Sequence, residues 1–233
     1  MEQVVKIIKE FNDLGYTCNE EQASKLLEYM LYLQEYNAKV NLTAITDDQG
    51  IIVKHFIDSL GSVNDIPEGA KLADIGSGAG FPAVVLKIFR PDLGVTLIES
   101  NGKKTTFLSS LIKRLNLEGI EVLNLRAEEC GRKQGLREGY DAVTARAVTE
   151  LNKLIEYALP LLKKGGALYA YKGRVDEELQ KASNAIVKLN GALKEARHYE
   201  LMEQKRSLVI ITKEGKTPSE YPRQNKKIIS NPL

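Results

Sequence analysis

A glycine-rich turn between a short apolar run and a predicted helix constrains this chain more than any other feature. Residues 71–81 read KLADIGSGAGF. The apolar residues 72–75 predict a strand, and a helix is expected to begin near Pro82, because proline is tolerated in a first helical turn. Gly76, Gly78 and Gly80 leave a ligand room to approach the backbone, and they permit φ values that other residues resist. The turn and the N–H groups of the helix N-terminus therefore predict a site for a polar ligand.

The residues around this turn favour S-adenosylmethionine (AdoMet) over a dinucleotide. The glycine spacing is G-x-G-x-G, whereas NAD-binding turns have G-x-G-x-x-G. Asp74 would repel a pyrophosphate, but it suits the ammonium and sulfonium of AdoMet. A second predicted strand, residues 95–98, ends at Glu99, where a carboxylate can accept hydrogen bonds from two ribose hydroxyls. We therefore expect Asp74, Glu99 and the loop residues Gly76, Ser77, Gly78 and Gly80 to bind AdoMet, with an NAD oxidoreductase as a weaker alternative.

The rest of the chain reads as one helical extension followed by an α/β domain. Residues 1–66 carry three apolar helical stripes, the second capped by Asn19 with Gln22 three residues on. From residue 67 to 214, strands are predicted at 72–75, 95–98, 120–125, 141–145, 167–171, 193–201 and 207–212, with helices between most of them. Gly165 and Gly166 are expected to end the helix of residues 150–162. This order predicts a doubly wound, mostly parallel seven-stranded sheet with a C-terminal β-hairpin, which is the Rossmann-like fold of class I AdoMet methyltransferases.

Composition limits the setting and the partners. The chain has 233 residues and a net charge of +2, so any affinity for nucleic acid must come from a local basic face. No apolar stretch is long enough to span a membrane, and the charged N-terminus does not resemble a secretory signal. Cys18 and Cys130 have no metal or redox spacing, which favours a cytoplasmic protein. No membrane partner and a monomer are expected. The tail, residues 215–233, is basic and contains three prolines, and it is expected to have little regular structure.

The residue inventory favours methyl transfer to an atom that is already nucleophilic. Cys130 falls in a predicted short helix, not at a nucleophile position, and residues 144–148 read TARAV instead of an Asn/Asp-Pro-Pro-aromatic loop. No cluster of carboxylates or histidines predicts a metal. The N7 atom of guanine needs no general base, so positioning would supply most of the rate enhancement. Arg146, at the carboxyl end of a predicted strand, is the candidate positioning residue. His55 and Asp58 share a helix face and are expected to form a hinge.

The chain resembles the RsmG family, also called GidB, of bacterial small-subunit rRNA guanine-N7 methyltransferases. The matching segments occur in order along nearly the whole chain: Tyr36-Asn37, residues 41–45, His55 with residues 58–60, residues 74–82, residues 97–100, Lys103-Lys104, Phe107-Leu108, residues 126–129, residues 146–148, residues 159–162, residues 171–173 and residues 221–223. The resemblance implies AdoMet contacts from Gly76, Phe81, Ala127, Glu128 and Arg146, with Glu99 at the ribose. It also implies a guanine in the decoding-region loop of 16S rRNA, in the small ribosomal subunit, as the target.

Reading an RNA base requires basic neighbours, and the candidates here are Lys172, Arg174, Arg206, Arg223, Lys226 and Lys227. One departure from the family is Ala83, where a glycine usually follows Gly-Phe-Pro. Two alternatives stay open: an AdoMet methyltransferase acting on a small molecule or a protein, and an RNA-binding module that is not an enzyme.

Overall fold

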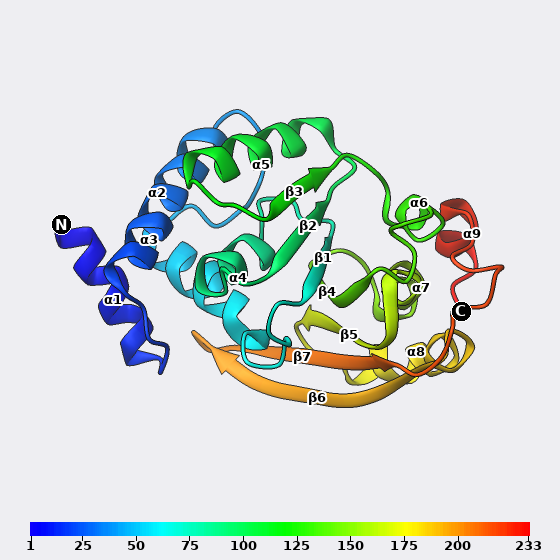
Figure 1. Ribbon diagram of the computed structural model, residues 1–233. Coiled ribbons are helices and arrows are strands. Elements are labelled where there is room, and N and C mark those ends of the chain that lie inside the picture. The colour runs from blue at the N-terminus through cyan, green and yellow to red at the C-terminus, as the bar shows by residue number, and fades with distance from the viewer.

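The computed structural model describes residues 1–233 and contains one seven-stranded sheet (Figure 1). Its strands are β1 (Lys71–Ile75), β2 (Gly94–Ile98), β3 (Ile120–Leu123), β4 (Tyr140–Arg146), β5 (Leu162–Lys172), β6 (Gly191–Leu201) and β7 (Gln204–Lys213). The spatial order is β3-β2-β1-β4-β5-β7-β6. The five strands β1 to β5 pair in parallel, while β7 runs antiparallel to both β5 and β6. The predicted fold class, including the C-terminal hairpin, is confirmed.

Helices cover both faces of this sheet. The elements that follow β1 to β5 are α4 (Ala83–Phe89), α5 (Gly102–Arg114), α6 (Ala127–Cys130), α7 (Leu151–Ala158) with the 3₁₀ turn Leu159–Leu161, and α8 (Asp176–Lys188). Before β1 come α1 (Glu2–Asp13), α2 (Glu20–Asn37), α3 (Asp48–Gly50), the π-helix Ile51–Ile57 and the 3₁₀ turn Leu60–Ser62. The predicted cap of α2 is confirmed, because Asn19 and Gln22 each accept a hydrogen bond from the other's backbone N–H, at 2.8 and 2.9 Å.

Two hydrophobic clusters lie on opposite faces of the sheet, because successive strand residues point to opposite sides. Leu72 belongs to the cluster of α1, α2, α4, α5 and the π-helix, whereas its neighbour Ala73 belongs to the cluster of α7 and α8. The N-terminal helices therefore share a core with one whole face of the sheet. The division into an extension, a methyltransferase domain and a tail stays a prediction.

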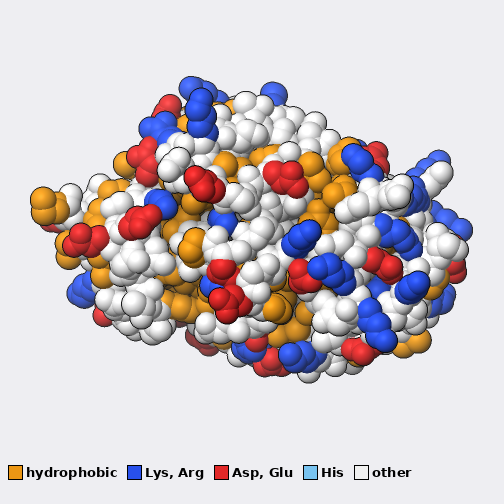
Figure 2. Space-filling model, viewed as in Figure 1, with side chains coloured by type: hydrophobic (Ala, Val, Ile, Leu, Met, Phe, Trp, Pro, Cys, Tyr) orange, Lys and Arg blue, Asp and Glu red, His pale blue; other side chains and the backbone are white.

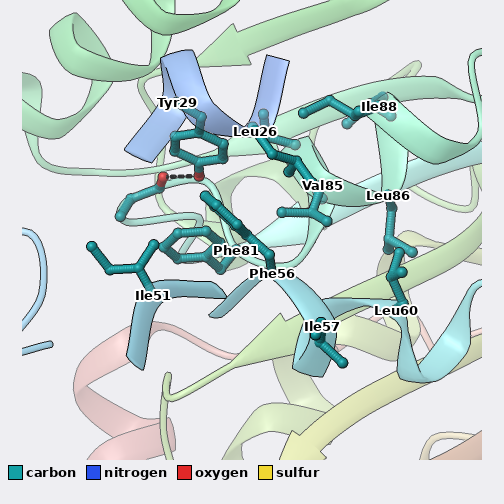
Figure 3. Packing of buried hydrophobic residues seen from close by; sticks show 14 of the residues in the cluster. Leu26, Tyr29, Ile51, Phe56, Ile57, Leu60, Phe81, Val85, Leu86 and Ile88 are labelled. Atoms are coloured by element: carbon teal, nitrogen blue, oxygen red, sulfur yellow. Dashed lines mark hydrogen bonds between the residues drawn. The ribbon is translucent and has the colours of Figure 1, made fainter. Parts of the chain in front are cut away.

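Aromatic side chains at the centre of the first cluster hold the glycine-rich loop in place (Figure 3). The Phe81 ring stacks on Tyr29 at a centroid distance of 5.2 Å, and Phe56 lies 5.3 Å from Tyr29. The Tyr29 hydroxyl donates a hydrogen bond to the main-chain oxygen of Ala79, drawn as the dashed line. At Gly80, with φ +98°, a Cβ atom would lie 2.6 Å from that hydroxyl. The loop therefore needs a glycine at this position.

Two expectations were wrong. Gly165 and Gly166 do not end a helix, since they lie within β5, at an irregularity where Tyr140 pairs with Leu162 but Ala142 pairs with Ala167. Gly165, with φ +86°, allows the strand to bulge there. The tail is also ordered and contains α9 (Asn225–Ser230). Arg137 donates hydrogen bonds to the carbonyls of Tyr221 and Thr217 at 2.6 and 3.0 Å, so the tail is fastened to the domain.

Among the helices, none combines the length and the apolar character that crossing a membrane would require.

Candidate functional site

A cavity of about 260 Å³ opens at the carboxyl ends of β1, β2 and β3, where parallel sheets bind their ligands. Four of the residues predicted to bind the cofactor line it: Gly76, Glu99, Ala127 and Glu128. They come from three successive strand ends, and the parallel order of those strands brings them together. We call this space the cofactor cavity.

Glu99 is oriented by two loops at once. Its Oε2 accepts a hydrogen bond from the Gly78 N–H at 3.0 Å, and its Oε1 accepts one from the Asn101 N–H at 2.8 Å. Each carboxylate oxygen keeps a lone pair, so both can still accept from a ligand. The side chain is only 8% exposed. This geometry fits a carboxylate that receives ribose hydroxyls.

Asp74 lies buried at the carboxyl end of β1 and is only half satisfied. Its Oδ1 accepts a hydrogen bond from the Thr144 hydroxyl at 2.7 Å, whereas its Oδ2 has no partner. Burial raises the pKa of Asp74 to about 7, although the Thr144 hydrogen bond opposes the shift. Buried carboxylate oxygens without partners are rare in proteins. A cationic ligand group would supply the missing interaction, so the site fits the ammonium or sulfonium of AdoMet.

Four other predicted cofactor residues, Ser77, Gly78, Gly80 and Phe81, shape the loop, and neither they nor Asp74 and Arg146 line the cavity. Ser77 is buried, and its hydroxyl donates to the main-chain oxygen of Asp74 at 3.1 Å. Gly78 supplies its N–H to Glu99, and Gly80 lies against Tyr29. Phe81 is buried, with its ring 4.5 Å from the ring of His55. The loop is therefore held between the sheet and the N-terminal helices.

Arg146, the last residue of β4, is held by residues 54–58 and by the Phe81 ring. Its Nη1 donates to Asp58 Oδ2 at 3.1 Å and to the Lys54 carbonyl at 3.2 Å, and its Nη2 contacts His55 Nδ1 at 3.0 Å. The guanidinium also lies 4.9 Å above the Phe81 ring, within the range of a cation–π interaction. These hydrogen bonds use three of the five guanidinium N–H groups. Two N–H groups are left without a protein partner.

His55 is a neutral acceptor in this cluster. Burial, together with the charge of Arg146, lowers its pKa to about 3. Since Nδ1 faces an arginine, which can only donate, the ring proton resides on Nε2, which lies 2.7 Å from the Thr43 hydroxyl. Both ring nitrogens are therefore occupied. The geometry gives His55 a positioning role, and both His55 and Asp58, which were expected to share a helix face as a hinge, contact Arg146.

A second cavity, of about 330 Å³, lies beside the first and is lined by Arg146, Asp58, Tyr171 and Lys172. Val148 and Thr149 line both cavities, so the two spaces share one wall. This wall follows Ala147, whose φ of +56° lies in the left-handed region that few residues other than glycine adopt. We call the second space the acceptor cavity.

A third cavity, of about 720 Å³, continues from the acceptor cavity through their shared residue Arg206. Its lining includes Arg174, Lys205 and His198, together with the acids Asp176 and Glu200. We call it the basic cavity. Three cavities thus run in sequence across the carboxyl edge of the sheet.

The residues predicted to bind RNA fall into three groups. Lys172 and Arg206 line the acceptor cavity and Arg174 lines the basic cavity, although Lys172 is already paired with Glu178 at 2.7 Å. Arg223, by contrast, forms a two-point ion pair with the fully buried Glu156. This placement favours a structural role for Arg223.

The remaining candidates, Lys226 and Lys227, are exposed on α9. Figure 2 shows Lys and Arg side chains gathered on the right of the molecule, where α6 and α9 lie in Figure 1.

Several residues at these cavities were not found by sequence reasoning. Tyr157, Asn225 and Ile229 line the cofactor cavity, and Tyr199 donates to Asp58 Oδ1 at 2.8 Å. Asn225 and Ile229 lie in a tail that was expected to be irregular, so no local signal pointed to them. Cys130, expected to be an ordinary helix residue, lies buried in α6.

Three features define an AdoMet-dependent methyltransferase with a Rossmann-like fold. They are the strand order, the glycine-rich loop and two acids, Asp74 near the end of β1 and Glu99 directly after β2. Solved structures share this fold at low sequence identity. A SAM-dependent methyltransferase from Aquifex aeolicus has a TM-score of 0.56 and 16% identity, covering 74% of this chain and 97% of that one. A SAM-dependent O-methyltransferase from Thermotoga maritima has a TM-score of 0.54 and 16% identity, covering 80% of this chain and 72% of that one.

The chain belongs to the GidB family, described as rRNA small subunit methyltransferase G, whose family model matches residues 22–209. Relatives named ribosomal RNA small subunit methyltransferase G cover most of its length. The protein from Acetivibrio thermocellus is 42% identical over 97% of this chain and 95% of its own. The protein from Lactobacillus delbrueckii subsp. bulgaricus is 45% identical over 87% of this chain and 88% of its own.

Proposed function

We propose that this protein transfers the methyl group of AdoMet to N7 of a guanine in the decoding-region loop of 16S rRNA. The observation that carries the proposal is the wall of Val148 and Thr149 that the cofactor and acceptor cavities share. A methyl donor in the cofactor cavity and a base in the acceptor cavity would both lie against these two residues and meet there. The family membership and the names of the relatives support small-subunit rRNA as the acceptor.

The side chains of the acceptor cavity suit an atom that needs no deprotonation. Asp58 is paired with Arg146 and Tyr199, and Lys172 is paired with Glu178. The Tyr171 hydroxyl donates to the Ser59 carbonyl, and burial raises the pKa of this phenol. Each of these groups already has partners within the protein, so the arrangement suits orienting a base more than removing a proton from it. Guanine N7 carries a free lone pair, so alignment with the methyl group is the main requirement.

The decisive experiment is methyl transfer from labelled AdoMet to small ribosomal subunits isolated from a strain that lacks this gene. We expect labelled N7-methylguanosine in 16S rRNA, identified by mass spectrometry of the nucleosides. Subunits from the parent strain are the matched control and should accept little label, since their site is already modified. Transfer to neither RNA sample, with AdoMet bound, would discard the proposed substrate and favour a small-molecule or protein acceptor. Absence of AdoMet binding would favour an RNA-binding module.

AdoMet affinity should rise with pH between about 5 and 7, because the cationic end of the ligand meets Asp74. Burial raises the pKa of Asp74 to about 7, so the free protein holds this carboxyl neutral at lower pH. A neighbouring ammonium favours the ionised form. Binding therefore releases a proton at low pH, and Kd should fall by up to about tenfold per pH unit before levelling off. Titration calorimetry across this range measures the effect.

The matched control is Asp74→Asn, which keeps the shape of the side chain and cannot ionise. This variant should bind AdoMet more weakly and with little change between about pH 5 and 7. A wild-type Kd that stays constant over the same range would show that no cationic group of the ligand lies near Asp74.

The basic cavity is the proposed path of the RNA strand toward the acceptor cavity. Arg174→Ala combined with Lys205→Ala should weaken RNA binding and lower the slope of log K against log salt by about 1.4 to 1.8, because each lost phosphate contact removes about 0.7 to 0.9. The measurement is a filter-binding titration of a 16S rRNA fragment at several salt concentrations.

Lys188→Ala at the end of α8 with Lys194→Ala near the start of β6 removes the same charge outside the basic cavity and is the control for this double variant. If both double variants lower the slope equally, the basic cavity has no special part in RNA binding.

A further inference from the structure

The C-terminal tail reaches the cofactor cavity from outside the residues that the family model matches. The family model ends its match at residue 209, whereas α9 begins at Asn225. Asn225 and Ile229 nevertheless line the same cavity as Gly76, Glu99 and Ala127. Figure 1 shows α9 beside α6, on the side of the sheet where β3 ends.

We propose that α9 is a wall of the AdoMet site and contacts the adenine end of the ligand; this inference rests on the proposed function. AdoMet is a linear ligand, with methionine, ribose and adenine in that order. Asp74 at the end of β1 suits the methionine end, and Glu99 after β2 suits the ribose. The adenine then continues in the direction of β3 and α6. Leu125, Ala127 and Ile229 line the cavity on that side.

The two α9 side chains have the chemistry that an adenine ring requires. Ile229 is 57% exposed, although its neighbour Ile228 is fully buried. An isoleucine side chain at the rim of a cavity would lose exposed apolar surface when a flat ring lies against it. Asn225 accepts a hydrogen bond from the Tyr157 hydroxyl at 2.5 Å through Oδ1. Its amide N–H groups have no protein partner and can donate to the ring nitrogens of adenine.

Hydrogen bonds and apolar packing hold α9 in a fixed position, as a wall of the cavity requires. Glu156, on α7 and fully buried, accepts hydrogen bonds from three N–H groups of Arg223: the main-chain N–H at 2.8 Å, Nε at 2.8 Å and Nη2 at 2.6 Å. Arg132 donates to the Pro222 carbonyl at 2.9 Å. These bonds lie immediately before α9, so they fix its position relative to α7. Ile228 anchors the helix itself by packing into the cluster of α7 and α8.

The test is titration calorimetry of full-length variants with S-adenosylhomocysteine and with 5′-methylthioadenosine, which both contain adenine. Ile229→Ser should weaken both ligands by about 3- to 10-fold, and Asn225→Ala by a similar factor. The control is Val187→Ser on α8, which removes an aliphatic side chain that is 74% exposed and lies outside the cavity. It should leave both affinities unchanged. Thermal melting checks that all three variants are folded.

The outcomes separate this inference from the proposed function. Suppose that the unmodified protein binds both ligands and that Ile229→Ser and Asn225→Ala bind them with wild-type affinity. The proposed role of α9 is then overturned, and the methyltransferase function is unaffected. Weaker binding of S-adenosylhomocysteine with unchanged binding of methylthioadenosine would place α9 at the amino-acid end and also overturn the assignment. If the unmodified protein binds neither ligand, the wall and the proposed function both fail.

Discussion

Arg146→Lys should lower kcat/KM for methyl transfer by about 100-fold while AdoMet affinity stays close to that of the wild type. Lysine keeps the positive charge beside Asp58, so the buried carboxylate is not left unpaired. It cannot, however, reproduce the planar set of contacts to Asp58, His55 and the Lys54 carbonyl. A lysine ammonium in a different position would no longer align the base with the methyl group. Rate losses near 100-fold are typical of small displacements of this kind.

Single-turnover kinetics that follow the formation of methylated subunits would measure this effect, and titration calorimetry would measure the affinity for AdoMet. Tyr199→Phe is the matched control, because it removes one hydrogen bond to Asp58 and leaves the guanidinium and its other partners in place. It should cost much less than Arg146→Lys. Activity of Arg146→Lys within a few-fold of the wild type would mean that the cluster around Arg146 serves folding alone.

Glu156→Ala should lower the free energy of unfolding by about 3 to 5 kcal/mol, the usual cost of removing one partner from a buried ion pair. Glu156 is fully buried, and the Arg223 side chain is 12% exposed. The change would leave the guanidinium without its carboxylate and release the segment before α9. Urea denaturation followed by circular dichroism measures the loss.

Two further variants show whether the ion pair is the cause. Glu150→Ala removes an exposed acid that pairs with Lys153 at the start of the same helix, and it should leave stability unchanged. Combining Glu156→Leu with Arg223→Leu removes both charges, and it should recover part of the loss. If Glu156→Ala and Glu150→Ala melt alike, the tail does not depend on this pair.

The parallel part of the fold could be predicted because its signals are local. Each of β1, β2 and β4 is a short apolar run, and the acids Asp74 and Glu99 occupy fixed places relative to those runs. Parallel pairing then brings consecutive strand ends to one edge, so the cofactor cavity follows from topology. The glycines of β5 misled the prediction, since Gly165 serves equally well as a helix terminator or as a bulge.

The rest of the site depends on contacts between distant residues, which no local pattern reveals. Arg146 meets Asp58 from 88 residues away, and Tyr199 meets the same Asp58 from 141 residues away. Arg223 meets Glu156 over a separation of 67 residues. Three prolines and several lysines predicted a tail with little regular structure, and composition cannot reveal the contact between Arg223 and a buried acid far away in the sequence. The π-helix Ile51–Ile57, which presents His55, likewise has no sequence signature.

The cofactor cavity and the acceptor cavity are built from elements that differ in how readily they open. The cofactor cavity is built in part on the ends of β1 and β2, which are both flanked by other strands of the sheet. The acceptor cavity depends on Lys54, His55 and Asp58, which belong to helices outside the sheet. Segments of this kind open with less free energy than central strands. We therefore expect the side that faces the proposed RNA path to open more readily to a nucleotide, while Asp74 and Glu99 keep their places at the strand ends.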